Sequence, residues 1–172
     1  GEDDTYGPYV VLEFLLGDSL RQRLDSSAGK MGWNEVLEKV ARPMLQALAA
    51  LHEAGIVHRD VKPENLFDCG DGTYKLGDLG LASFAGREAH TKTGAFFGTP
   101  KYLAPERLNT TDDATAAVDV YSGAMLIVEV MAGCHPFKET SIGDLVKAQL
   151  EKKISHQFIA GHGVPAMAAR AL

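Results

Sequence analysis

Cysteine is scarce in this 172-residue sequence, which contains only Cys69 and Cys134. Two cysteines cannot form a disulfide framework, and their spacing is not that of metal ligands, so we expect a reduced, cytoplasmic compartment. Basic residues are also outnumbered, because 17 Lys and Arg stand against 23 Asp and Glu, for a net charge of −6. This acidic balance argues against a nucleic acid or an anionic membrane surface as the partner.

Long apolar runs are missing as well. The most apolar stretch, residues 119–137, carries Glu129 near its middle and is too short to cross a bilayer, so it predicts a buried core helix. The first ten residues are acidic where a signal peptide would be basic, and we therefore expect no signal peptide. The composition, 45% hydrophobic and 23% charged, is that of a globular protein, and the length predicts one domain.

Residue patterns predict the order of the elements. A run of β-branched and aromatic residues (YVVLEFL, 9–15) predicts a buried strand, and the Gly/Asp-rich turn within residues 65–80 predicts a hairpin. Helices are expected within 17–27, over 33–54, over the core stretch, near 141–152 and over 164–172. Pro43 lies inside the second of these and predicts a kink or a break. Residues 81–105 lack periodicity and are expected to form a long surface segment.

Acid, base and amide groups crowd into residues 57–66, VHRDVKPENL. Asp60 can accept a proton from an attacking hydroxyl, and Lys62 can hold a transferring phosphoryl group as a point charge. Asn65 offers an amide oxygen, a hard ligand suited to Mg²⁺. Asp78, across the expected hairpin, adds a carboxylate for a metal that bridges phosphates. Together these residues predict phosphoryl-transfer chemistry.

This pattern resembles the eukaryotic-type serine/threonine protein kinases over essentially the whole chain. HRDVKPEN (58–65) is similar to their catalytic loop, DLG (78–80) to their metal-binding motif, and GTPKYLAPE (98–106) to the end of their activation segment. The resemblance implies a protein-kinase-like α+β fold, with a mostly α-helical large lobe, a hinge strand and a short β-hairpin. The implied parts are the hinge strand (9–17), the catalytic loop (56–66), the activation segment (78–106) and a helical subdomain (107–172).

The resemblance also implies a role for each matched residue, with ATP and Mg²⁺ as cofactors. The implied catalytic residues are Asp60 as base and Lys62 as phosphate contact, and the implied magnesium ligands are Asn65 and Asp78. The implied adenine site consists of the gatekeeper Leu12, the hinge residues Glu13 and Leu15, Ser19 and Phe67. The implied structural residues are His58, Glu106 and Asp119, of which Asp119 anchors the catalytic loop.

The kind of acceptor and the mode of control also follow from the resemblance. Lys62 and Thr99, which would dock the substrate, favour serine or threonine over tyrosine as the acceptor. Arg59 beside the base implies control by phosphorylation of the activation segment, because a guanidinium pairs well with phosphate. Thr91 and Thr93 stand where bacterial members of the family often carry such a pair, which favours a bacterial-type kinase.

Part of the family pattern is missing from the sequence. No stretch matches the glycine-rich phosphate loop or the strand with its paired lysine, and no segment supplies the arginine that normally pairs with Glu106. We therefore expect a truncated domain that is inactive alone, with most of the small lobe absent. We also expect Glu106 to lack its buried partner, and apolar surface to be exposed around Leu12, Phe67 and Leu79.

Two other functions stay open. A small-molecule phosphotransferase has a related His-x-Asp-x₄-Asn loop, but GTPKYLAPE and the separate Asp119 argue against it. A catalytically inactive, kinase-like binding or scaffold module is the other, although all four polar residues of the expected catalytic site are retained. The partners expected from the main reading are ATP and proteins with serine or threonine acceptors, with no nucleic acid and no membrane segment.

Overall fold

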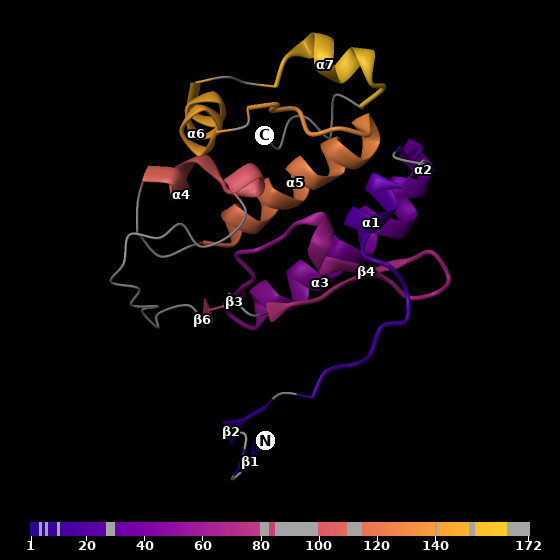
Figure 1. Ribbon diagram of the computed structural model, residues 1–172, viewed down its shortest axis with the longest axis vertical. Helices are drawn as coiled ribbons and strands as arrows, with labels where there is room; N and C mark the ends of the chain where they lie inside the picture. Colours follow the sequence, from indigo (N-terminus) through magenta and orange to yellow (C-terminus); the bar gives the residue numbers. More distant parts are fainter. Residues whose placement is uncertain are drawn as a thin grey trace.

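Helix α5 (Ala116–Ala132) runs through the middle of the molecule, with α6 and α7 on one side and α3 with the strand β4 on the other (Figure 1). The computed structural model describes residues 1–3, 5, 7–9, 11–26, 30–79, 83–84, 100–109, 115–139, 141–151 and 154–164. The other α-helices are α1 (Leu20–Asp25), α2 (Trp33–Glu35), α3 (Arg42–Glu53), α4 (Pro105–Asn109), α6 (Ile142–Glu151) and α7 (His156–Gly161). A π-helix, η1 (Val36–Ala41), and two 3-10 helices, η2 (Pro63–Asn65) and η4 (Pro100–Tyr102), complete the described helical elements.

The described strands pair two by two, each pair antiparallel. They are β1 (Glu2–Asp3) with β2 (Gly7–Pro8), β3 (Ile56–Val57) with β6 (Ser83–Phe84), and β4 (Leu66–Asp68) with β5 (Tyr74–Leu76). The β4–β5 pair is the predicted hairpin. Its turn is closed by Asp68, whose Oδ1 accepts the N–H groups of Gly70 at 2.7 Å and Gly72 at 3.0 Å. Both glycines have positive φ, a conformation that costs little energy because glycine has no Cβ.

The apolar stretch predicted to be a core helix is buried as expected. Helix α5 contributes to each of the three hydrophobic clusters: Leu126 and Val128 to the largest, Met125 to the second and Val118 to the third. It ends at Gly133, whose φ of 73° is the left-handed conformation that commonly terminates a helix. Because this helix touches every cluster, side chains that it carries are held in fixed positions.

Helix α1 begins with a capping box. The Oγ of Ser19 accepts the N–H of Gln22 at 3.3 Å, and the N–H of Ser19 donates to Oε1 of Gln22 at 2.7 Å. Two donors at the helix start are thereby satisfied. The short helix predicted within residues 17–27 is confirmed, and its first turn is well fixed.

The break predicted around Pro43 is present as a change of helix type. The π-helix η1 gives way to α3 one residue before the proline, and the N–H of Arg42 donates five residues back to the carbonyl of Leu37. Pro43 has no N–H to donate to the carbonyls of the preceding turn, which agrees with the change in hydrogen-bond pattern at this point of the helix. Helix α3 then ends before Gly55, which has a φ of 72°.

The buried strand predicted at residues 9–15 is wrong. Residues 11–16 form no strand and run as a connection from the β1–β2 hairpin towards α1 (Figure 1). Val11 is 83% exposed, Phe14 83% and Leu16 88%. None of the described strands pairs with this stretch, so its backbone has no ladder to join, and apolar side chains alone do not make a strand. Leu12 and Leu79 are exposed as expected, whereas Phe67 is half-buried.

The C-terminal part departs from the sequence expectation as well. Helix α6 was predicted and is confirmed, while α7 was not predicted. The helix predicted over 164–172 lies outside the described residues except for Val164. Within the described chain, none of the helices has the length and apolar character needed to span a bilayer.

Candidate active site

The loop between β3 and β4 brings together three residues that the sequence predicts to be catalytic or metal-binding. Asp60 is 9% exposed and Asn65 is 4% exposed. The Nδ2 of Asn65 donates to Oδ2 of Asp60 at 3.0 Å and to its backbone carbonyl at 2.8 Å. The Nζ of Lys62 lies 2.7 Å from the same Oδ2. One carboxylate oxygen therefore receives both a cation and an amide donor.

A buried carboxylate of α5 holds this loop in place through hydrogen bonds to its backbone. Asp119 is fully buried, and its Oδ2 accepts the N–H of His58 at 2.8 Å while its Oδ1 accepts the N–H of Arg59 at 2.8 Å. The Nε2 of His52, from the last turn of α3, lies 2.8 Å from Oδ2. The predicted anchoring geometry is present, whereas His52 was missed, because a histidine at a helix end carries no signal that sets it apart.

Two non-glycine residues in the region have left-handed backbones. Arg59 has a φ of 68° and Asp78 a φ of 59°. Such conformations cost on the order of 1–3 kcal/mol and persist where the surroundings over-determine them. At Arg59 the compensation is visible, since its N–H is aimed at Asp119.

His58 joins the loop to the segment that carries Asp78. Its side chain is fully buried, its Nδ1 accepts the N–H of Asp60 at 3.3 Å, and its Nε2 lies 3.1 Å from the carbonyl of Gly77. Because a carbonyl only accepts, these contacts assign the proton to Nε2. The N–H of Gly77 in turn donates to the carbonyl of Asn65 at 2.8 Å. Asp78 is thus attached through its neighbour to both His58 and Asn65.

The residues predicted for the adenine site are only partly assembled. Ser19 and Phe67 form an antiparallel bridge, and Gly17 packs so closely on β4 that a Cβ there would lie 2.4 Å from the carbonyl oxygen of Asp68. Leu15 is half-buried. By contrast, Leu12 is 71% exposed. Glu13 is also exposed, and its Oε1 lies 2.8 Å from Nζ of Lys75.

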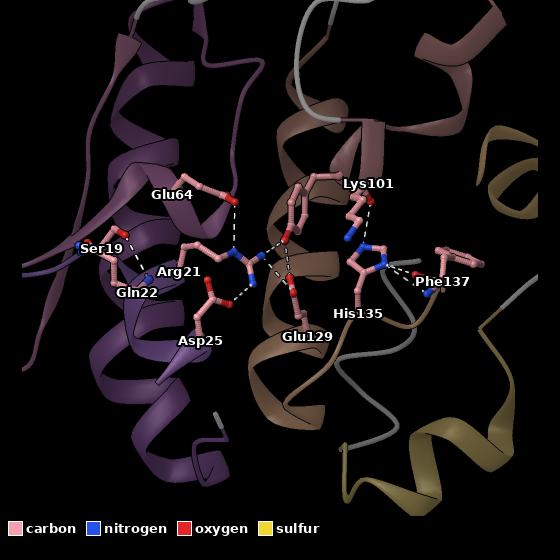
Figure 2. Close-up of polar contacts among 10 residues, drawn as sticks. Ser19, Arg21, Gln22, Asp25, Glu64, Lys101, Glu129, His135 and Phe137 are labelled. Carbon is pink, nitrogen blue, oxygen red and sulfur yellow. Dashed lines mark hydrogen bonds and ion pairs between the residues drawn. The ribbon is translucent and has the colours of Figure 1, made fainter. Parts of the chain in front are cut away.

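A second polar cluster was not foreseen, although Glu129 had stood out in the apolar stretch. Figure 2 shows Arg21 of α1 between Glu64 of the loop and Glu129 of α5. Its Nε lies 3.1 Å from Oε1 of Glu64, and its Nη2 lies 3.1 Å from Oε1 of Glu129 and 2.6 Å from Oη of Tyr102. The hydroxyl of Tyr102 donates to Glu129. Burial, followed by the charge of Glu129, raises the pKa of the Tyr102 hydroxyl.

The cluster ties four elements together: α1, the loop, α5 and the turn η4. Glu129 thereby finds the partner that a buried carboxylate requires. No sequence signal links these four residues, because they lie far apart along the chain.

The donor set suits the metal that the sequence predicts. The amide nitrogen of Asn65 is engaged by Asp60, which leaves its amide oxygen as the atom for a cation. A carboxylate at Asp78 is the second oxygen donor. Mg²⁺ prefers such hard oxygen ligands and completes its shell with water and phosphate oxygens, so these residues fit it.

One expectation about the activation segment is wrong. Glu106 is exposed in the first turn of α4 and is engaged by a neighbouring group, so it is not a buried carboxylate without a partner. Carboxylates are well tolerated near a helix N-terminus, where the backbone dipole favours negative charge. Thr91, Thr93 and Thr99 lie outside the described residues.

Comparison with known proteins covers nearly the whole chain. The family model described as the protein kinase domain matches residues 2–165. The chain is 38% identical over 165 residues to the serine/threonine-protein kinase PknL of Mycobacterium tuberculosis, covering 96% of this chain and 40% of PknL. It is 34% identical over 162 residues to the probable serine/threonine-protein kinase pknA2 of Bifidobacterium longum, covering 94% and 21%.

A plant protein is similar too. The chain is 34% identical over 159 residues to the CBL-interacting protein kinase 9 of Oryza sativa, covering 89% of this chain and 34% of that protein. The chain thus spans between about a fifth and two fifths of the length of these relatives. The resemblance to kinases of bacterial type, and the largely helical kinase-like fold predicted from it, are confirmed. The chain belongs to the protein kinase domain family.

Proposed function

We propose that the protein containing this chain transfers the γ-phosphoryl group of Mg-ATP to serine or threonine hydroxyls of other proteins. The observation that carries the proposal is the arrangement around Asp60, whose Oδ2 is held by Lys62 at 2.7 Å and Asn65 at 3.0 Å. The names of the relatives, which describe serine/threonine-protein kinases, support the same reaction. The scarcity of cysteine supports a cytoplasmic setting for this domain.

Asp60 acts as the base in this proposal. Because Lys62 and Asn65 both contact Oδ2, the other oxygen, Oδ1, accepts the proton of the attacking hydroxyl. The hydroxyl oxygen forms a bond to the γ-phosphorus as the bond to the β–γ bridging oxygen breaks, giving ADP and a phosphoester. Lys62 supplies positive charge beside the transferring group, and positioning and charge of this kind provide most of the catalysis in phosphoryl transfer.

Asn65 and Asp78 would hold Mg²⁺, which when bound neutralises charge on the phosphate oxygens. The bridge between Ser19 and Phe67 supports an adenine-binding surface at the start of α1. Leu12, Glu13 and Leu15 complete the proposed adenine site. Thr99 is the proposed docking residue for the acceptor.

The test is phosphoryl transfer from radiolabelled ATP by the full-length protein. Casein serves as the acceptor, and Asp60→Asn is compared with Asp25→Asn, an aspartate whose side chain is 68% exposed. We expect transfer by the unaltered protein and by Asp25→Asn, and a loss of at least about a hundredfold in Asp60→Asn, the lower range for a general base.

Other outcomes identify the alternatives. Transfer to small alcohols or amino-sugars but to no protein would make this a small-molecule phosphotransferase. Binding of Mg-ATP without transfer to any acceptor would make it a non-catalytic module. Equal transfer by Asp60→Asn and Asp25→Asn would remove Asp60 from the role of base.

A further inference from the structure

The turn η4 is held by buried side chains from three places in the chain. The Oγ of Ser122, from α5, lies 2.7 Å from the carbonyl oxygen of Tyr102 and 2.8 Å from that of Val118, which share its one proton. The Nε2 of His135, which follows α5, lies 3.1 Å from the carbonyl of Lys101. The Nε2 of Gln149, from α6, donates to the carbonyls of Pro100 and Lys101 at 3.1 and 3.0 Å. Every carbonyl of this three-residue turn therefore lies within hydrogen-bond distance of a side-chain donor.

The ring of His135 is fixed on both sides. Figure 2 shows it between Lys101 and Phe137. Its Nδ1 lies 3.2 Å from the backbone nitrogen of Phe137 and 3.0 Å from the carbonyl oxygen of the same residue, and its Nε2 faces the carbonyl of Lys101. With its proton on Nε2, the imidazole donates to the carbonyl of Lys101 in the turn, and Nδ1 accepts the N–H of Phe137. The ring also meets Tyr102 edge-on, with centroids 5.5 Å apart and an interplanar angle of 90°.

Gln149 is oriented by the same turn. Its side chain is buried, with the residue 6% exposed, and its Oε1 has no hydrogen-bond partner among the residues that the structure describes. Turning the amide over would place this oxygen against two carbonyl oxygens. A buried acceptor without a donor is unfavourable, so the two bonds to the turn are what keep the amide in this orientation.

The turn is also linked to the catalytic loop. Tyr102 bonds through its hydroxyl to Glu129 and Arg21, and Arg21 reaches Glu64, four residues after Asp60. On one side of η4, Arg21 therefore fixes the residues of this turn relative to Asp60. From the other side they are placed by the donors to the three carbonyls.

We propose that His135 and Gln149 are positioning residues for the protein acceptor, holding η4 as part of the surface on which the acceptor chain docks. The inference rests on the proposed function, in which residues 98–106 form the end of the activation segment. Neither residue is among those assigned to the nucleotide or the metal. Loss of either donor should therefore weaken the use of the acceptor and leave the use of ATP unchanged.

The experiment compares variants of the full-length protein in steady-state transfer from Mg-ATP to casein. Gln149→Glu removes the donor, and Gln46→Glu makes the same change at an exposed position of α3. His135→Asn places its amide near the former Nδ1 and loses the donor at Nε2, whereas His135→Gln reaches the position of Nε2 and keeps it. The KM for casein and the KM for ATP are measured separately.

We expect Gln149→Glu and His135→Asn to raise the KM for casein about tenfold, the factor for roughly one hydrogen bond. The KM for ATP should change less than about twofold, and Gln46→Glu and His135→Gln should resemble the unaltered protein. Equal increases in both KM values, or no difference between His135→Asn and His135→Gln, would overturn the inference alone. If Gln149→Glu fails to fold, the His135 pair decides. Absence of transfer by the unaltered protein would overturn the proposed function and this inference with it.

Discussion

Replacing Asp119 by asparagine should loosen the catalytic loop. The carboxylate accepts the N–H groups of His58 and Arg59 and contacts His52, each at 2.8 Å, in a fully buried site. An asparagine keeps one oxygen, so its NH₂ group faces at least one former donor. A hydrogen bond to a charged group contributes about 1.5–3 kcal/mol, and a buried donor left unsatisfied costs about 1–3 kcal/mol. We expect a loss of about 3 kcal/mol in the free energy of unfolding.

Urea unfolding of the kinase domain, followed by the fluorescence of Trp33, measures this loss. Trp33 packs against the largest core cluster, so its emission reports on that core. With a typical denaturant slope of about 2 kcal/mol per molar, the midpoint should fall by about 1.5 M. The matched control is Asp25→Asn, which is exposed and should leave the midpoint unchanged.

Activity gives a second reading of the same change. Arg59 has a φ of 68°, and its N–H is held by Asp119. Without that bond the backbone can relax and displace Asp60, and a displacement of about 1 Å can cost about a hundredfold in rate. Equal urea midpoints for Asp119→Asn and Asp25→Asn would refute the view that Asp119 anchors the loop.

Three further predictions concern other groups. Glu129→Gln should lower the free energy of unfolding by about 2 kcal/mol, less than for a fully buried pair because the Arg21 side chain is 24% exposed. Burial raises the pKa of Tyr121 from 10.0 to about 12, so the unfolded chain releases this proton first. The stability that it contributes is complete below pH 10 and is lost as the pH rises through about 12. Mass spectrometry of active protein should find phosphate on Thr91 or Thr93, because a phosphate there can pair with a guanidinium beside the base.

Each of these three predictions has its own control variant or contradicting result. The control for Glu129→Gln is Asp25→Asn, which removes a more distant and more exposed carboxylate from the guanidinium of Arg21. It should leave the midpoints of thermal and urea unfolding unchanged. Tyr121→Phe should remove part of the loss of stability between pH 10 and 12, and equal losses in both proteins would contradict the assignment. Full activity of a protein with alanine at both threonines would argue against control through Arg59.

The catalytic loop was predictable because its chemistry lies within one short segment. Asp60, Lys62 and Asn65 fall within six residues, and the fold only has to bend the loop for them to meet. Asp119 was predictable for a different reason, because the resemblance to protein kinases implies an aspartate at the start of the core helix that anchors the loop. Aspartate at the start of a buried helix needs donors, and the loop supplies them.

The contacts that could not be predicted join residues that are distant along the chain. Nothing local in the sequence pairs Arg21 with Glu129, or Gln149 with the carbonyls of η4. The strand predicted at residues 9–15 is wrong because β-branched and aromatic side chains favour a strand without supplying the neighbouring backbone that a strand also needs. Exposure of Phe14 records the absence of such a neighbour among the described residues.

The π-helix η1 has a consequence for the angular phase of α3. Val36, Val40, Met44 and Leu48 follow one another at four-residue intervals, and each is at most 2% exposed. In a straight α-helix each such interval overshoots a full turn by about 40°, so three would carry the last residue about 120° out of line. The wider turn of η1 takes up part of this drift. Deleting one residue within η1 would restore α-helical geometry and leave α3 nearly in phase, whereas deleting one residue within α3 would rotate the residues after it by about 100° and turn His52 away from Asp119.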